Sequence, residues 1–81
     1  SVQFRKYKEQ YSDALILFRV GDFYESYEDD AIYLHDVLNI TLHQREGNWW
    51  SKMSGFPCHC LDTYIAKIVR SGKRVAICEF Q

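Results

Sequence analysis

Proline, glycine and low-complexity segments are scarce in this sequence. Its 81 residues include one proline, Pro57, and four glycines, and no Gly/Ser-rich stretch marks a linker between domains. A disordered chain lacks the apolar groups that offset the entropy of ordering, whereas 47% of these residues are hydrophobic and 16% are aromatic. A chain of this length has room for one hydrophobic core. We therefore expect a single folded domain over residues 1–81.

An excess of positive charge is also missing. Lys and Arg number 10 against 11 Asp and Glu, which gives a net charge of −1. Non-specific affinity for DNA comes mainly from Lys and Arg side chains that neutralise phosphates. A DNA-binding role therefore requires positive charge clustered on one face, or other domains or partners that supply most of the affinity. The densest basic cluster comprises Lys67, Arg70, Lys73 and Arg74. It is the candidate for a phosphate-facing patch, although a solvated helix end is the default explanation of such a cluster.

The sequence lacks a long apolar run, a signal-like leader and an even number of cysteines. No run approaches the roughly 20 residues that a membrane-spanning helix needs, so we expect no membrane partner. The odd count of Cys58, Cys60 and Cys78, without a leader, indicates reduced thiols in a cytoplasmic protein. A Gly-x-x-x-x-Gly-Lys-Ser/Thr loop is absent too, so we predict no nucleotide site of that kind and no cofactor in this chain.

The spacing of the apolar residues predicts three helices and a small sheet. Helices are expected at Val2–Gln10, from Asp29 or Asp30 to Leu38 before Asn39, and at Leu61–Arg70 before Gly72. The strongest helix signal is the helical spacing in the third of these segments, shown by Leu61, Tyr64, Ile65, Ile68 and Val69. Strands are expected at Ala14–Val20, Ile40–His43, from Trp49 onward after the turn Glu46–Asn48, and at Arg74–Phe80, with a break at Gly55–Pro57. The order helix, strand, helix, hairpin, helix, strand implies a mixed sheet with packed helices, in the α+β class.

Three segments together resemble a known family. They are Leu17–Glu25, Met53–His59 and the pair Tyr64–Lys67 with Val75–Glu79. In this order and spacing, from about Tyr7 to Gln81, the chain is similar to the N-terminal mismatch-recognition domain (domain I) of the MutS family of DNA mismatch-repair proteins. The Phe-x-Glu motif within the first segment would carry no signal alone.

The resemblance implies the fold of MutS domain I and a role in DNA repair. The implied partners are double-stranded DNA with mismatches or small loops, and other domains of a parent repair protein. The implied location is the bacterial cytoplasm, associated with the nucleoid. No catalysis is implied for this chain, and ATP binding would belong only to a full-length parent. The chain departs from the family at Cys58 and Cys60, where an aromatic and a small residue are more usual. It also departs in the pair Trp49–Trp50. This pair could be a stacking platform for single-stranded nucleic acid, but we favour one Trp in the core and one at the edge.

The segment Gly21–Glu25 carries the chemistry that the resemblance implies. Gly21 permits a sharp turn, and an extended Phe23–Glu25 would place Phe23 and Glu25 on one side and Tyr24 in the core. A mismatched pair stacks poorly, so inserting a phenyl ring there costs less than the few kcal/mol of an intact step. In the family this Phe stacks on the mismatched base and this Glu hydrogen-bonds to it, which implies the same roles for Phe23 and Glu25.

Two features of this segment stay open. The Glu25 carboxylate could accept a hydrogen bond from a thymine imino group, or donate one to a purine N7 once protonated. Three neighbours are candidates for contacts to the DNA backbone or for contacts that flank the inserted Phe23 ring: Arg19, Gly21 and Asp22. A phosphate contact from Arg19 competes with a salt bridge or simple solvation.

The sequence also permits alternatives to a mismatch-binding domain. A free-standing relative that no longer reads mismatches would be a protein-interaction module. A metal-dependent nuclease would need clustered carboxylates and a Lys, but the residue two positions after Glu79 is Gln81. Metal binding by Cys58-His59-Cys60, with Cys78 or His43, is disfavoured because the ligands are too close together for one tetrahedral ion.

Overall fold

The computed structural model describes residues 2–79 and contains a five-stranded mixed sheet with three α-helices in that range. The strand order is β3-β4-β2-β1-β5, in which β1 and β5 run parallel and the other neighbours are antiparallel. The chain follows the order α1 (Val2–Gln10), β1 (Ala14–Val20), β2 (Phe23–Tyr27), α2 (Asp29–Leu38), β3 (His43–Gln44), β4 (Lys52–Pro57), α3 (Leu61–Arg70) and β5 (Arg74–Cys78). The expected α+β class with a mixed sheet is therefore confirmed.

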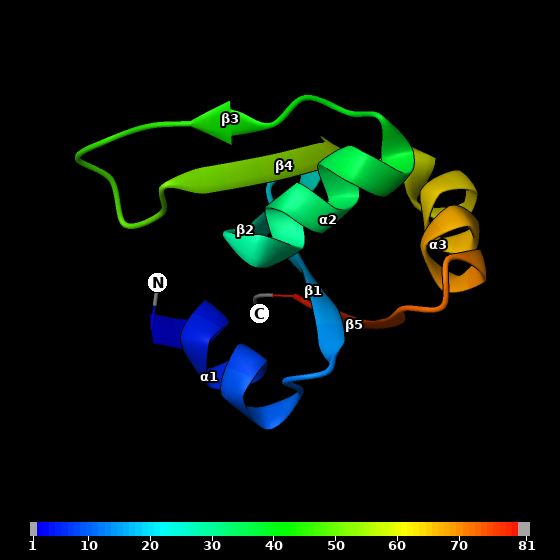
Figure 1. Ribbon diagram of the computed structural model, residues 1–81, viewed down its shortest axis with the longest axis horizontal. Coiled ribbons are helices and arrows are strands. Elements are labelled where there is room, and N and C mark those ends of the chain that lie inside the picture. Colours follow the sequence, from blue (N-terminus) through cyan, green and yellow to red (C-terminus); the bar gives the residue numbers. More distant parts are fainter. Residues whose placement is uncertain (1, 80–81) are drawn as a thin grey trace.

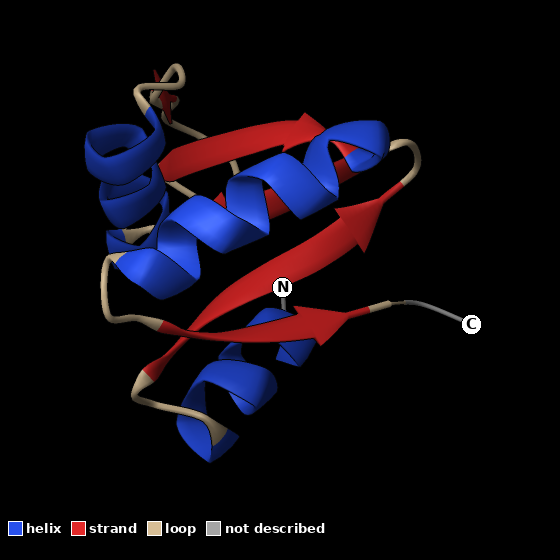
Figure 2. Cartoon of the chain, turned by 90° about the vertical axis from the view of Figure 1, so that its right-hand side faces the viewer, coloured by secondary structure: helices blue, strands red, loops and turns tan. Residues whose placement is uncertain are grey.

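One face of the sheet is covered by two helices. Alternate side chains of β1, β2 and β4 point to this face and pack with α2 and α3, which lie together and apart from α1 (Figures 1 and 2). The buried cluster on this face comprises Leu15, Leu17, Tyr24, Leu34, Leu38, Phe56 and Ile68. This face therefore holds the larger part of the core.

The opposite face is covered only in part. Here α1 contributes Phe4 and the half-buried Tyr7, and the buried cluster is Phe4, Ile16, Phe18, Tyr27, Trp50 and Cys78. A partly buried ion pair holds α1 in place, since Lys8 Nζ lies 2.7 Å from the buried Asp30 Oδ1. Asp30 Oδ2 also accepts a hydrogen bond of 3.0 Å from the Ile16 backbone N–H. The helix α1 thus covers the end of the sheet near Ile16 and Tyr27, and residues farther along β1 and β2 are exposed.

The ends of α2 explain why this helix has the length that the sequence predicted. It ends at Leu38 because Asn39 adopts a left-handed conformation, with φ of 58°. Before its first residue, Glu28 has a φ of 55°, which is uncommon for a non-glycine residue. Three hydrogen bonds compensate this strain, because the Glu28 carboxylate accepts from the N–H and hydroxyl of Ser51 and from the N–H of Lys52.

Three predictions of local structure are wrong. Phe23–Tyr27 forms a strand, β2, that the predicted order of elements omits. Gly55–Pro57 does not break the hairpin but continues β4 beside β2, and β4 begins at Lys52 rather than at Trp49. Only His43 of the predicted strand Ile40–His43 is in a strand, because the Ile40 carbonyl accepts a hydrogen bond of 2.7 Å from His35 Nδ1 instead of a ladder bond.

The helix α3 has the bounds that the spacing predicted, and it buries Ile68 fully while leaving Val69 57% exposed. The predicted last strand reaches Cys78, and its expected end at Phe80 lies outside the described residues. The prediction for the two tryptophans is confirmed, since Trp50 is buried and Trp49 is exposed.

Candidate functional site

A tight turn of two residues places Phe23 at the start of β2. Gly21 has a φ of 59°, in the left-handed region that favours glycine. Arg19 Nε donates a hydrogen bond of 2.9 Å to the Gly21 carbonyl, and the Cys58 N–H donates one of 2.8 Å to the Asp22 carbonyl. The turn is therefore fixed from the β1 side and from the segment after β4.

The adjacent residues Phe23 and Tyr24 point to opposite faces of the sheet. The Phe23 side chain is 47% exposed, whereas Tyr24 is 4% exposed and packs under α2 and α3. The register of β1 and β2 pairs Phe23 with Val20, which is itself 42% exposed. The extended geometry thus presents an open apolar edge, made by Phe23 and Val20, on the face that α1 leaves uncovered.

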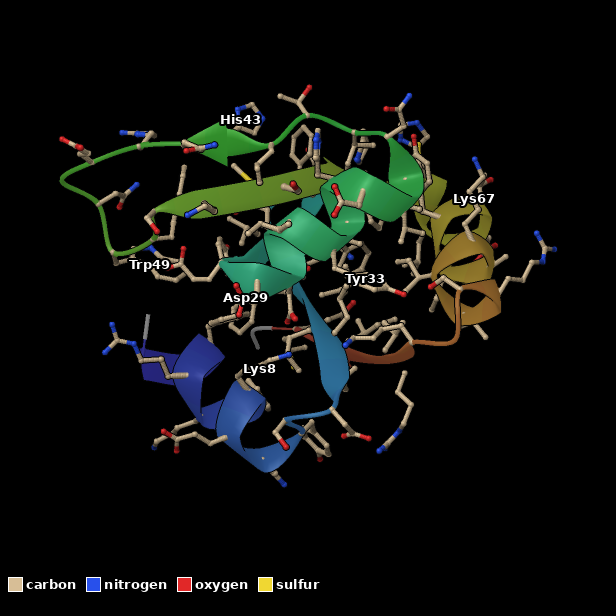
Figure 3. All side chains as sticks on the ribbon, in the orientation of Figure 1. Lys8, Asp29, Tyr33, His43, Trp49 and Lys67 are labelled. Carbon is tan, nitrogen blue, oxygen red and sulfur yellow. The ribbon has the colours of Figure 1, made fainter. Side chains whose placement is uncertain are left out.

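Glu25 lies beside Phe23 on the same face and lines a shallow groove. The groove has a volume of about 240 Å³ and is lined by Phe23, Glu25, His43, Met53 and Gly55. Glu25 itself is half-buried, and Oε1 of its carboxylate accepts a hydrogen bond of 2.8 Å from the Tyr27 hydroxyl. One wall comes from β3, which carries His43 (Figure 3). His43 is in register with Met53 of β4.

Gly55 provides the room that Glu25 occupies. Gly55 pairs with Glu25 across β2 and β4, and a Cβ at position 55 would lie 3.2 Å from Glu25 Cγ and 2.8 Å from the Tyr24 carbonyl oxygen. The second distance is shorter than real Cβ contacts. A side chain at this position would therefore displace the strand and crowd the carboxylate.

Arg19 and the basic cluster are not beside the groove. Arg19 is in register with Tyr24, so it lies on the face opposite to Phe23, where its Nη1 is 3.8 Å from Glu79 Oε1. The Tyr24 hydroxyl donates a hydrogen bond of 2.8 Å to the same Glu79 oxygen, and this bond, followed by burial, raises the pKa of Tyr24. Arg74 is the first residue of β5, beside Ala14, and it forms an ion pair with Asp13. This is the end of β1 opposite to Val20. Neither Arg19 nor Arg74 therefore brings positive charge to the groove.

Sequence reasoning missed three lining residues: His43, Met53 and Gly55. A glycine within a strand pattern often marks close approach of another chain segment, so Gly55 carried a usable signal. His43 and Met53 become neighbours of Phe23 only through the strand register, which the misplaced hairpin obscured.

The residues considered for metal chemistry lie in three elements, with His43 in β3, Cys78 in β5 and the consecutive Cys58–Cys60 after β4. Cys58–Cys60 forms one turn of 3₁₀-helix, and within residues 2–79 no group of three His, Cys, Asp or Glu side chains is placed to hold a metal ion. Gln81, on which the nuclease argument depends, lies outside the described residues. The described part of the chain also contains no helix that is long and apolar enough to cross a membrane.

Comparisons with known proteins agree with the fold. The family model described as MutS domain I matches residues 1–81. Proteins named DNA mismatch repair protein MutS are 54% identical over 80 residues in Phocaeicola vulgatus, 49% over 79 residues in Porphyromonas gingivalis and 49% over 77 residues in Thermosipho melanesiensis. Each alignment covers 95% of this chain, which spans 9% of the length of each of these relatives.

Proposed function

The chain belongs to the MutS domain I family, and on that premise we propose that it binds double-stranded DNA at mismatched or otherwise distorted base steps, in mismatch repair. Phe23 is the side chain that inserts into the stack, and Glu25 is the side chain that contacts the displaced base. The observation that carries this proposal is the exposure of Phe23, which is 47% in a chain whose Phe18 and Phe56 are 3% and 2% exposed. A large apolar ring left outside the core, beside a carboxylate, has no role in packing that would explain it.

The proposed selectivity comes from the deformability of DNA. A ring presented to each step enters where unstacking is cheapest, and a mismatched step costs less to open than the few kcal/mol of an intact one. The groove of about 240 Å³ beside the ring gives the edge of a displaced base a place next to Glu25. No base sequence is read by this arrangement, and it assigns no catalysis to the chain.

Charge limits what the chain does alone. Its net charge is −1, and Glu25 faces a partner rich in phosphates. The proposal therefore includes other domains of a repair protein, or a partner, as the source of most of the affinity. The proposed setting is the bacterial cytoplasm. Of the flanking candidates, Gly21 and Asp22 shape the turn through backbone carbonyls, and a phosphate contact by Arg19 would have to come from the opposite face of the sheet.

The test is a pair of titrations for each variant, with a matched duplex and the same duplex carrying one mismatch. Phe23→Ala should lower the preference for the mismatched duplex toward one, since stacking on a base is worth about 1–3 kcal/mol. Glu25→Ala should also lower the preference while raising affinity for the matched duplex, because it removes a negative charge from the interface. Ile77→Ala is the control, since Ile77 is 41% exposed on the face opposite to Phe23 and should leave the preference unchanged.

The free energy of unfolding, measured by denaturant or heat, distinguishes an inserting ring from a core residue. Phe23→Ala should lower it by well under the roughly 3–5 kcal/mol that truncation of a buried Phe costs, whereas Phe56→Ala should lower it by that amount. If Phe23→Ala unfolds the chain, or if both site variants keep the mismatch preference of the parent, the proposal fails. The second result would favour a protein-interaction module on the same fold.

A further inference from the structure

Glu25 is held by a residue that the resemblance does not implicate. Phe23, Glu25 and Tyr27 alternate along β2 and so share one face of the sheet. The Tyr27 hydroxyl donates a hydrogen bond of 2.8 Å to Glu25 Oε1. Among the described residues, no donor reaches the second carboxylate oxygen, Oε2. The two oxygens of one functional side chain are therefore not equivalent.

We propose that Tyr27 is a positioning residue for Glu25: its hydroxyl holds Oε1 and thereby presents Oε2 to a base in the groove. This inference rests on the proposed function of Phe23 and Glu25. A glutamate has three rotatable side-chain bonds, and holding one oxygen removes most of that freedom before DNA arrives. Less order then has to be created on binding, which favours the correct contact over the many incorrect ones.

The Tyr27 ring is itself held firmly enough to act as an anchor. It is 3% exposed, and it packs edge-on against Phe4 of α1 at 5.1 Å and against Trp49 of the loop before β4 at 4.3 Å between ring centroids. The ring therefore cannot turn its hydroxyl away without opening the cluster under α1. Burial, followed by the bond to Glu25, raises the pKa of Tyr27, so the hydroxyl stays a protonated donor in any ordinary assay.

Gly55 limits Glu25 from the neighbouring strand. A Cβ at position 55 would lie 3.2 Å from Glu25 Cγ, so the glycine marks the space through which the Glu25 chain passes. The carboxylate is thus bounded by the Tyr27 hydroxyl on its own strand and by the backbone of β4 on the other. On the third side Phe18 of β1 pairs with Glu25, and the groove lined by Phe23 and His43 lies toward the turn.

The same strand offers a matched control. Tyr24 is 4% exposed, and its hydroxyl donates a bond of the same 2.8 Å length to a glutamate, Glu79. That bond lies on the face of the sheet opposite to Phe23. Tyr24→Phe and Tyr27→Phe therefore delete equivalent groups from one strand, and only the second touches the proposed site.

The experiment measures the ratio of Kd for matched duplex to Kd for a G·T-mismatched duplex, with the protein at its full natural length. Tyr27→Phe should lower this ratio about tenfold, which corresponds to about 1.4 kcal/mol and is close to the worth of a hydrogen bond to a charged group. Tyr24→Phe should leave the ratio within about twofold of the parent while costing similar stability. Thermal melting of every variant fixes a titration temperature at which all are folded, since both substitutions keep the ring and its packing.

A double-mutant comparison tests whether Tyr27 acts through Glu25. In a Glu25→Ala background, Tyr27→Phe should have no further effect on the ratio. An equal effect in both backgrounds, or a ratio for Tyr27→Phe equal to that of the parent, would overturn the inference and leave the proposed function intact. If Glu25→Ala and Phe23→Ala both keep the parental ratio, the proposed function fails, and the inference fails with it.

Discussion

The buried carboxylate of Asp30 allows a stability prediction that can be worked from the structure. The Asp30 side chain is 5% exposed and accepts from Lys8 Nζ at 2.7 Å and from the Ile16 N–H at 3.0 Å. Asp30→Ala leaves the Ile16 N–H buried without its acceptor, at about 1–3 kcal/mol. It also leaves Lys8, which is 31% exposed, without its counter-charge. Breaking a fully buried pair typically costs about 3–5 kcal/mol, and because Lys8 is partly exposed and keeps its hydrogen bond to the Ala14 carbonyl, we expect a loss near the lower end of that range.

The assay is urea unfolding followed by tryptophan fluorescence, because the buried Trp50 reports on the cluster under α1. Asp30→Asn should lose less than Asp30→Ala, since an amide oxygen can still accept from Ile16. The control is Asp13→Ala, which breaks the Arg74–Asp13 pair. That pair is also short, at 2.6 Å, but its side chains are 70% and 61% exposed, so solvent screening should leave only a small effect. If Asp30→Ala costs no more than Asp13→Ala, the reasoning from burial is wrong.

Three further predictions concern pH, DNA affinity and the cysteines. Burial opposes ionisation of Glu28, but hydrogen bonds from Lys52 and Ser51 outweigh it and lower its pKa, so its stabilising contribution is complete above pH 4.5 and disappears as the pH falls through the lowered value. The difference in unfolding free energy between the parent and Glu28→Gln should therefore shrink from pH 7 to pH 3, and a constant difference would contradict this. The isolated chain should bind duplex DNA weakly and lose that binding at physiological salt in a fluorescence titration; binding that survives would show that the charge argument is wrong. Thiol titration of native and denatured protein should find all three cysteines reduced, and elemental analysis should find no bound metal. One equivalent of tightly held zinc would refute the prediction that the cysteines bind no metal.

The helices and the first strand could be predicted because their signals are local. Apolar residues at helical spacing bury Leu34 and Ile68, and the left-handed Asn39 ends its helix as a local cap. The run from Ala14 to Phe18 is apolar throughout because both faces of β1 are covered there. These features depend on neighbours along the chain and need no knowledge of the sheet.

The misassigned segments depend on contacts between distant residues. Phe23–Tyr27 is a strand because β1 and β4 pair with it on both sides, although its letters show no apolar alternation. The glycine and proline of Gly55–Pro57 predict a break, but these residues continue β4 because they pair with Phe23–Glu25 of β2. The signal that could have located β2 was the Gly-Asp pair between two short runs, which is typical of a tight hairpin turn.

The candidate site lies where the covered and the open parts of one sheet face meet. Along β2, Tyr27 is buried under α1, Glu25 is half-buried and Phe23 is exposed, so burial decreases steadily toward the turn. The helix α1 creates this gradient because it covers only one end of the face and is held there by Lys8. A fully covered face would bury Phe23, and a fully open one would leave Tyr27 free to move. Partial coverage allows an exposed ring and an oriented carboxylate to stand two residues apart, so the contacts that stabilise α1 also set the geometry of the proposed reading site.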